Sequence, residues 1–136
     1  MKSRIYSFTV IYFFLIAIAA SVFLSCSNPL SSSDSLTGPH SWYYTISTSD
    51  GTSPFVSSCV NSSGGDDSPG TVASPWTSPT YSMTLSVPMA IGVTAVLPSS
   101  AAASTTITAR LYADGKFVSS QTSSGPGAGA ALSAQL

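Results

Sequence analysis

Residues 104–122 read STTITARLYADGKFVSSQT, and this stretch carries the clearest fold signal in the chain. Asp114-Gly115 lies between two runs rich in β-branched and aromatic residues, which is typical of a β-hairpin with a two-residue type I′ turn. The turn predicts a register in which Ala113 faces Lys116, Tyr112 faces Phe117 and Leu111 faces Val118. We expect one apolar face, made of Ile107, Ala109, Leu111 and Val118. Arg110 lies on the opposite face, where its aliphatic stem can run along the aromatic rings.

The same alternation of apolar and polar residues recurs on both sides of this hairpin. It predicts further strands at 42–46, 55–60, 72–76, 81–87, 91–97 and 128–136. The run at 72–76 is expected at a sheet edge, because Pro75 has no N–H to donate. Cys59 falls within a strand and is expected to be a buried small hydrophobic residue. Short strands separated by turns, with no helical period, predict an all-β, immunoglobulin-like β-sandwich of about 7–8 strands.

The composition agrees with an all-β domain and excludes several classes of function. Only 7% of the 136 residues are charged, the net charge is −1, and 44 residues are Ser or Thr. Helical bundles depend on Ala, Leu, Glu and Lys, so this composition disfavours them. Without a basic surface we expect no nucleic-acid partner. One His and two Cys are too few for a zinc tetrad, so we expect no metal and no cofactor.

Residues 1–25 have the organisation of a secretory signal. Lys2 and Arg4 form a positive n-region, and the run from Ile5 to Leu24 is almost entirely apolar, which predicts a signal helix. Phe23-Leu24-Ser25-Cys26 then resembles the lipobox of bacterial lipoproteins. The resemblance implies that the signal is cut before Cys26, whose thiol takes a diacylglycerol. Several acyl chains on one residue would anchor the protein stably.

This resemblance predicts three segments. Residues 1–25 are the signal peptide, 26–40 are the lipidated Cys26 with a flexible Ser/Pro-rich tether, and 41–136 are the β-sandwich domain. Two other readings of the N-terminus stay open: an uncleaved membrane anchor, and secretion after cleavage near Ala17–Ala19. Lipoprotein sorting implies that Ser27, in place of Asp, favours the outer membrane of a bacterium with two membranes.

The last thirty residues resemble the C-terminal part of the MmpS family of small membrane proteins. The matching residues are Ile107, Leu111, Asp114, Gly115, Lys116, Val118, Ser124 and Gly125. Trp76 after Pro75, and the strand at 43–46, resemble that family further upstream, although its paired cysteines are missing here. The resemblance implies an extracytoplasmic β-sandwich and an accessory role beside a membrane exporter of lipids or siderophores.

Few residues suggest site chemistry. His40 falls in the predicted tether, a poor place to fix a general base, and no Gly-x-Ser-x-Gly motif frames a nucleophile. Asp66 and Asp67 could offer oxygen ligands to Ca²⁺ or simply be solvated loop charges. The aromatic residues Trp42, Tyr43, Tyr44, Trp76 and Tyr81 could line a sugar or lipid groove, but packing is the simpler explanation.

We therefore expect a non-enzymatic, membrane-anchored lipoprotein of the bacterial cell envelope with a binding or scaffolding domain and no catalytic residues. Its partners would be the membrane, through the lipid, and an envelope protein. The exporter accessory is one alternative. The other is a surface structural or adhesive domain, which the Ser/Thr-rich and nearly uncharged composition favours.

Overall fold

The computed structural model describes residues 37–136, which form strands and connecting turns and contain no helix. The strands are β1 (Gly38–Thr48), β2 (Phe55–Val60), β3 (Asp66–Asp67), β4 (Gly70–Thr71), β5 (Trp76–Thr77), β6 (Tyr81–Leu85), β7 (Ala90–Val96), β8 (Thr106–Ala113), β9 (Lys116–Ser124) and β10 (Gly129–Gln135). In this part of the chain, seven strands have five residues or more and three have two.

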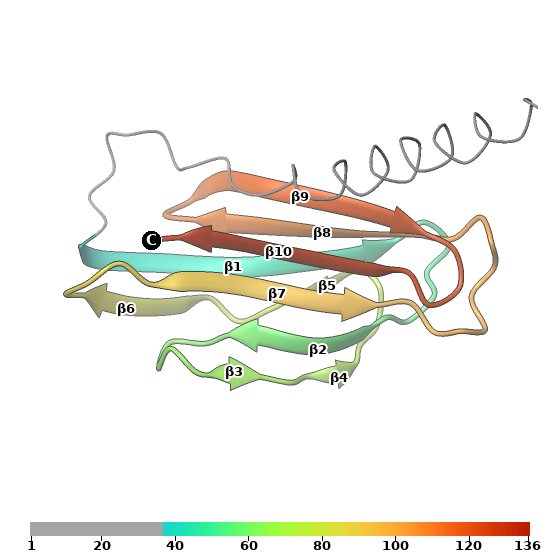
Figure 1. Cartoon of the computed structure of the whole chain (residues 1–136), viewed down its shortest axis with the longest axis horizontal. Coiled ribbons are helices and arrows are strands. Elements are labelled where there is room, and N and C mark those ends of the chain that lie inside the picture. Colours follow the sequence, from blue (N-terminus) through green and yellow to red (C-terminus); the bar gives the residue numbers. More distant parts are fainter. Residues whose placement is uncertain (1–36) are drawn as a thin grey trace, which may run out of the picture.

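The strands form two antiparallel sheets (Figure 1). Sheet A has the order β5-β1-β8-β9, with β6 also pairing with β1, and sheet B has the order β10-β7-β2-β3, with β4 also pairing with β2. The two sheets enclose one hydrophobic core. The prediction of an all-β sandwich is therefore confirmed at the level of architecture.

The core follows the predicted alternation. In β1 the residues Trp42, Tyr44 and Ile46 are buried, and their neighbours are only half-buried. The inward positions of β7 and β8 complete the core from both sheets: Ile91, Val93 and Ala95 from β7, and Ile107, Ala109 and Leu111 from β8. Because side chains of a strand point alternately to opposite faces, period-2 patterns identified these positions correctly. Cys59 in β2 is buried as well.

The hairpin between β8 and β9 has the predicted two-residue turn. Asp114 and Gly115 have φ values of 50° and 75°, and Ala113 pairs with Lys116. The register then shifts, because Leu111 pairs with Ser119 instead of Val118. Val118 is the extra residue of a β-bulge, which local patterning does not reveal. The predicted pair of Leu111 with Val118 is therefore wrong, although Val118 still packs against the core.

Two predicted boundaries differ from the structure. Strand β1 begins at Gly38, so the last three residues of the expected tether belong to the sandwich, where they pair with residues 83–85 of β6. The expected strand at 72–76 is wrong. Only Trp76 of that run is in a strand, β5, which pairs with β1. Pro75 interrupts the ladder because it lacks an N–H.

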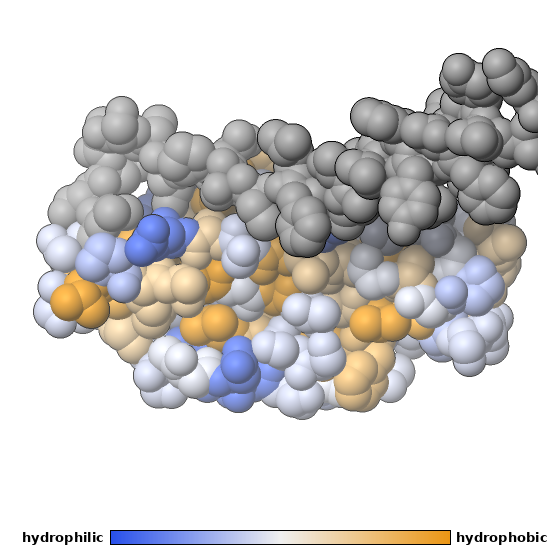
Figure 2. Space-filling model, viewed as in Figure 1, coloured by the Kyte–Doolittle hydropathy of each residue, from blue (hydrophilic) through white to orange (hydrophobic). Residues whose placement is uncertain are grey.

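Figure 2 shows pale, weakly polar side chains interspersed with tan and orange, more hydrophobic ones on the face in view, and only a few strongly hydrophilic ones. This agrees with a domain whose charged residues between 37 and 136 are four Asp, one Lys and one Arg.

Candidate functional site

The predicted lipidation site, Cys26, lies outside residues 37–136, as do the expected signal peptide and most of the expected tether. Its modification therefore stays a prediction. The side chains available to a site within the described residues fall into three groups. These are a histidine–aspartate pair, a buried thiol network and an aromatic surface.

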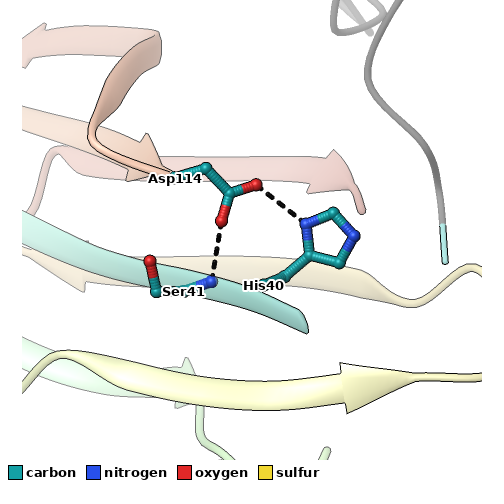
Figure 3. A network of polar contacts seen from close by, with 3 residues as sticks. All are labelled: His40, Ser41 and Asp114. Atoms are coloured by element: carbon teal, nitrogen blue, oxygen red, sulfur yellow. Dashed lines mark hydrogen bonds and ion pairs between the residues drawn. The ribbon is translucent and has the colours of Figure 1, made fainter. Parts of the chain in front are cut away.

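The first group joins the tip of the β8–β9 hairpin to the start of β1 (Figure 3). The carboxylate Oδ2 of Asp114 lies 2.8 Å from Nδ1 of His40, and its Oδ1 accepts a hydrogen bond of 2.8 Å from the backbone N–H of Ser41. The Asp114 N–H in turn donates to the Ser41 carbonyl at 2.8 Å. The His40 side chain is 9% exposed. The expectation that His40 lies in a tether and is poorly fixed is therefore wrong, because β1 extends through it.

An aspartate that orients a histidine is also found in hydrolases, where the other ring nitrogen activates a nucleophile. Here Nε2 of His40 is buried and has no hydrogen-bond partner among residues 37–136. Ser41 contributes its backbone N–H to the network, and its hydroxyl forms none of these bonds. The observed contacts hold the hairpin against β1.

The pKa of the Asp114 carboxyl is lower than usual. Partial burial acts in the opposite direction and is the largest single influence, but it is outweighed by other interactions. The hydrogen bonds from Ser41 and His40, together with the nearby positive charge of Lys116, favour the ionised form.

The second group is a chain of polar contacts that runs from the buried Cys59 thiol through Tyr81 to the exposed Asp67. The Cys59 thiol lies 3.5 Å from the hydroxyl of Tyr81, which donates to Asp67 Oδ2 at 3.1 Å. The pKa values of the Cys59 thiol and the Tyr81 hydroxyl are both raised, and burial is the largest cause in each case. A thiol with a raised pKa is mostly protonated near neutral pH and is a weak nucleophile. This network is therefore a structural link between β2 and β6.

Asp66 and Asp67 use their carboxylates to fix the β2–β3 loop. Asp66 accepts from the hydroxyl of Ser58 at 2.9 Å, and Asp67 accepts from the side-chain amide of Asn61 at 2.8 Å. Within residues 37–136, no three His, Cys, Asp or Glu side chains are grouped so that they could hold a metal ion. The two carboxylates thus serve loop geometry in this structure.

The five aromatic residues singled out by sequence do not form one groove. Trp42, Tyr44 and Tyr81 are buried in the core, and the half-buried Trp76 packs against it. Tyr43 faces away from the core, where its ring stacks on that of Tyr112 at a centroid distance of 4.7 Å and an interplanar angle of 3°. Tyr112 also meets Phe117 edge-on, with centroids 5.8 Å apart.

We define the hairpin patch as Tyr43, Arg110, Tyr112 and Phe117, which the strand register places together on the outer face of sheet A. Phe117 is 57% exposed, and Arg110 and Lys116 are the only Lys or Arg residues between 37 and 136. The predicted hairpin register already has the rings of Tyr112 and Phe117 beside Arg110. It does not reveal the contribution of Tyr43, because that residue joins the patch through the long-range pairing of β1 with β8.

No helix among residues 37–136 has the length and apolar character needed to cross a bilayer. Comparison of the chain with protein families and with curated proteins gives no match.

Proposed function

We propose that the protein is a bacterial lipoprotein of the cell envelope, anchored by lipid on Cys26, whose β-sandwich acts in binding or scaffolding and has no enzymatic activity. The observation that carries the proposal is the Phe23-Leu24-Ser25-Cys26 sequence directly after a positively charged start and an apolar run. In a bacterium with two membranes, Ser27 after the lipidated residue favours the outer membrane.

The use of the ionisable side chains supports a non-enzymatic role. Each of the four Asp residues between 37 and 136 accepts hydrogen bonds from nearby hydroxyl, amide or backbone groups that fix turns and loops. The Cys59 thiol is buried. Catalytic acids, bases and nucleophiles generally converge on a substrate-sized space, whereas these groups are spread over separate turns and strands.

We describe the domain as immunoglobulin-like in architecture, meaning two antiparallel sheets packed over one core. In constant-type immunoglobulin domains the first two strands belong to the same sheet. Here β1 and β2 lie in different sheets, so the likeness does not extend to the strand order.

The intact mass of the protein extracted from membranes tests the anchor. We expect a chain that begins at Cys26 and carries the added mass of acyl chains, and a Cys26→Ser variant that loses both this processing and its lipid. Cys59→Ser is the matched control, because it removes the other cysteine and should leave the lipid mass unchanged. A Cys26→Ser chain that matures and partitions like the wild type contradicts the proposal.

The exporter-accessory alternative is favoured by one observation, the two-residue Asp114-Gly115 hairpin on which the MmpS resemblance is centred. It differs from the main proposal in the partner. Affinity purification after cross-linking in intact cells distinguishes them, because an accessory should recover a large membrane transporter component. Recovery of no such component counts against this alternative.

A further inference from the structure

Strand β9 is a long sheet edge that the described part of the chain leaves open. It pairs with β8 on one side, and no strand of residues 37–136 pairs with its other side. Figure 1 shows β9 at the margin of the described strands, with β8 between it and β1. Its central residues, Ser120, Gln121 and Thr122, are exposed. An open edge presents a row of main-chain donors and acceptors to which another strand can be added.

The other edges of the two sheets are protected against such an addition. Strands β3, β4 and β5 have two residues each, β3 is formed by two aspartates, and Pro75 directly precedes β5. Strand β6 has five residues and begins shortly after Pro79. Short strands, charges and prolines are common means of blocking an edge. Strand β10 approaches both β8 and β9, and its Ala131 N–H already donates to the side chain of Gln121 at 2.8 Å. Strand β9, by contrast, has nine residues, no proline and no charge after Lys116.

The main-chain groups that point outward from β9 belong to Ser120, Thr122 and Ser124. In an antiparallel ladder, residues that bond with the partner strand alternate with residues whose N–H and C=O point to the other side. The Gly125 N–H donates to the Thr105 carbonyl at 2.9 Å, which fixes this alternation between β8 and β9. The main-chain groups of residues 120, 122 and 124 are therefore directed away from β8, and no residue between 37 and 136 supplies a partner for them.

This edge is complementary to itself. When a second copy is related by a two-fold axis at Thr122, the two Thr122 residues face each other, and Ser120 faces Ser124 of the second copy. In that register every outward N–H and C=O of the three residues meets its complement, and the side chains that face each other carry hydroxyls. A hydroxyl pair of this kind already occurs on this face, because the Thr108 and Thr122 hydroxyls lie 2.8 Å apart across β8 and β9. Residues 117–124 carry no charge that would repel the same strand of the second copy.

The composition of the edge favours a second copy over a foreign peptide. Peptides that add to a sheet edge are selected by pockets that receive their alternate side chains. The edge residues of β9 on the outer face of sheet A are Ser120, Thr122 and Ser124, whose side chains are small and uncharged. A symmetric contact needs no such selection, because one surface meets its own copy.

We propose that two copies of the protein pair through β9, antiparallel and with Thr122 opposite Thr122, so that their A sheets join into one continuous sheet. The inference goes beyond the proposed function and does not depend on the lipid anchor. The pairing gives each open edge a partner and so removes the place at which unrelated strands could add.

Cysteine cross-linking of the full mature chain, purified in detergent, tests the register. Residues at hydrogen-bonded antiparallel positions have Cα atoms about 5.5 Å apart, which is within the range of a disulfide. We expect mild oxidation to join Thr122→Cys chains into covalent dimers. Ser120→Cys is the matched control on the same edge and face, because its two copies are about 13 Å apart along the strands and should not be joined. Chains that carry both Ser120→Cys and Ser124→Cys should again be joined. The wild type, with Cys26 and Cys59, gives the background.

Sedimentation equilibrium over a range of protein concentrations measures the dimer itself. Thr122→Lys places two positive charges opposite each other at the two-fold axis and should raise the dissociation constant of the dimer about tenfold or more. Thr71→Lys, on the exposed β4 edge of sheet B, is the matched control and should leave the dissociation constant unchanged.

A wild type that has the mass of one chain at all concentrations overturns the proposal. Equal yields of cross-link at residues 120 and 122 overturn it as well, because they indicate random collision. A dimer that Thr122→Lys leaves intact and that Thr122→Cys does not cross-link forms through another surface, which also overturns the pairing through β9. If a change at residue 122 prevents folding, the yield from the Ser120→Cys and Ser124→Cys chain and the mass of the wild type decide between these outcomes.

Discussion

The hydroxyl of Tyr44 is a link between the two sheets whose removal has a calculable cost. Tyr44 lies in β1 of sheet A and is fully buried, and its hydroxyl donates to the Val60 carbonyl at 3.2 Å and accepts from the Gly92 N–H at 3.1 Å. Both of these partners belong to sheet B. The Val60 carbonyl also accepts a 3.0 Å bond from Trp42 Nε1, so it keeps a partner in a Tyr44→Phe variant. The Gly92 N–H loses its partner in that variant.

Leaving one buried donor without a partner costs about 1–3 kcal/mol. For a domain of this size the melting temperature should fall by about 4–8 °C for each kcal/mol. Thermal unfolding of the purified chain, followed by near-UV circular dichroism, measures this change. The control is Tyr112→Phe, which removes a hydroxyl on the outer face of sheet A, where surface substitutions change the free energy of unfolding by about 0.5 kcal/mol or less.

The dependence on pH provides a second measurement of the same side chain. Burial, the largest influence, raises the pKa of Tyr44 above its ordinary value. The folded protein then holds a proton that the unfolded chain loses near pH 10, so Tyr44 makes stability fall as the pH rises above about 10. Tyr44→Phe should reduce this alkaline loss. The reasoning is refuted if Tyr44→Phe and Tyr112→Phe melt alike and lose stability equally at high pH.

Three further predictions concern the turn, the ion pair and the contact between two strands. Gly115→Val should lower the free energy of unfolding by more than about 1 kcal/mol. The reason is the φ of 75°, which disfavours a β-branched residue, since no atom lies within 4 Å of an added Cβ. An unchanged urea midpoint would contradict the assigned turn. Asp114→Asn, which still tolerates positive φ, should lower the free energy of unfolding at neutral pH by about 1 kcal/mol or less, since the Asp114 side chain is 40% exposed. Because the pKa of Asp114 is lowered in the fold, this contribution is present above about pH 4 and is lost as the pH falls further. A difference between wild type and Asp114→Asn that persists at about pH 2 would show that the carboxylate charge is not its source. Gly92→Ala places a Cβ 2.6 Å from the Leu132 carbonyl oxygen, so we expect the free energy of unfolding to fall by about 1–3 kcal/mol and amide exchange in β10 to be faster. Amide exchange as slow as in the wild type would refute the close approach of the two strands.

The sequence alone determined the features that depend on neighbouring residues. Alternation identified the inward faces of β1, β7 and β8, because a strand repeats its side-chain direction every two residues. The Asp114-Gly115 pair fixed the turn of the hairpin, because few residues adopt positive φ at both positions. The low charge and the abundance of Ser and Thr favoured strands over helices.

Tertiary structure alone decided which distant residues meet. The His40–Asp114 contact joins residues 74 positions apart, and the Tyr44–Gly92 bond joins residues 48 apart, so no local period encodes them. The same holds for the hairpin patch, which needs Tyr43 of β1 beside Tyr112 of β8. The bulge at Val118 and the start of β1 at Gly38 were missed because a partner strand, rather than the residues themselves, sets register and length. Patterning thus fixed which face of each strand is buried, and the packing of the two sheets fixed what those faces and their edges bring together.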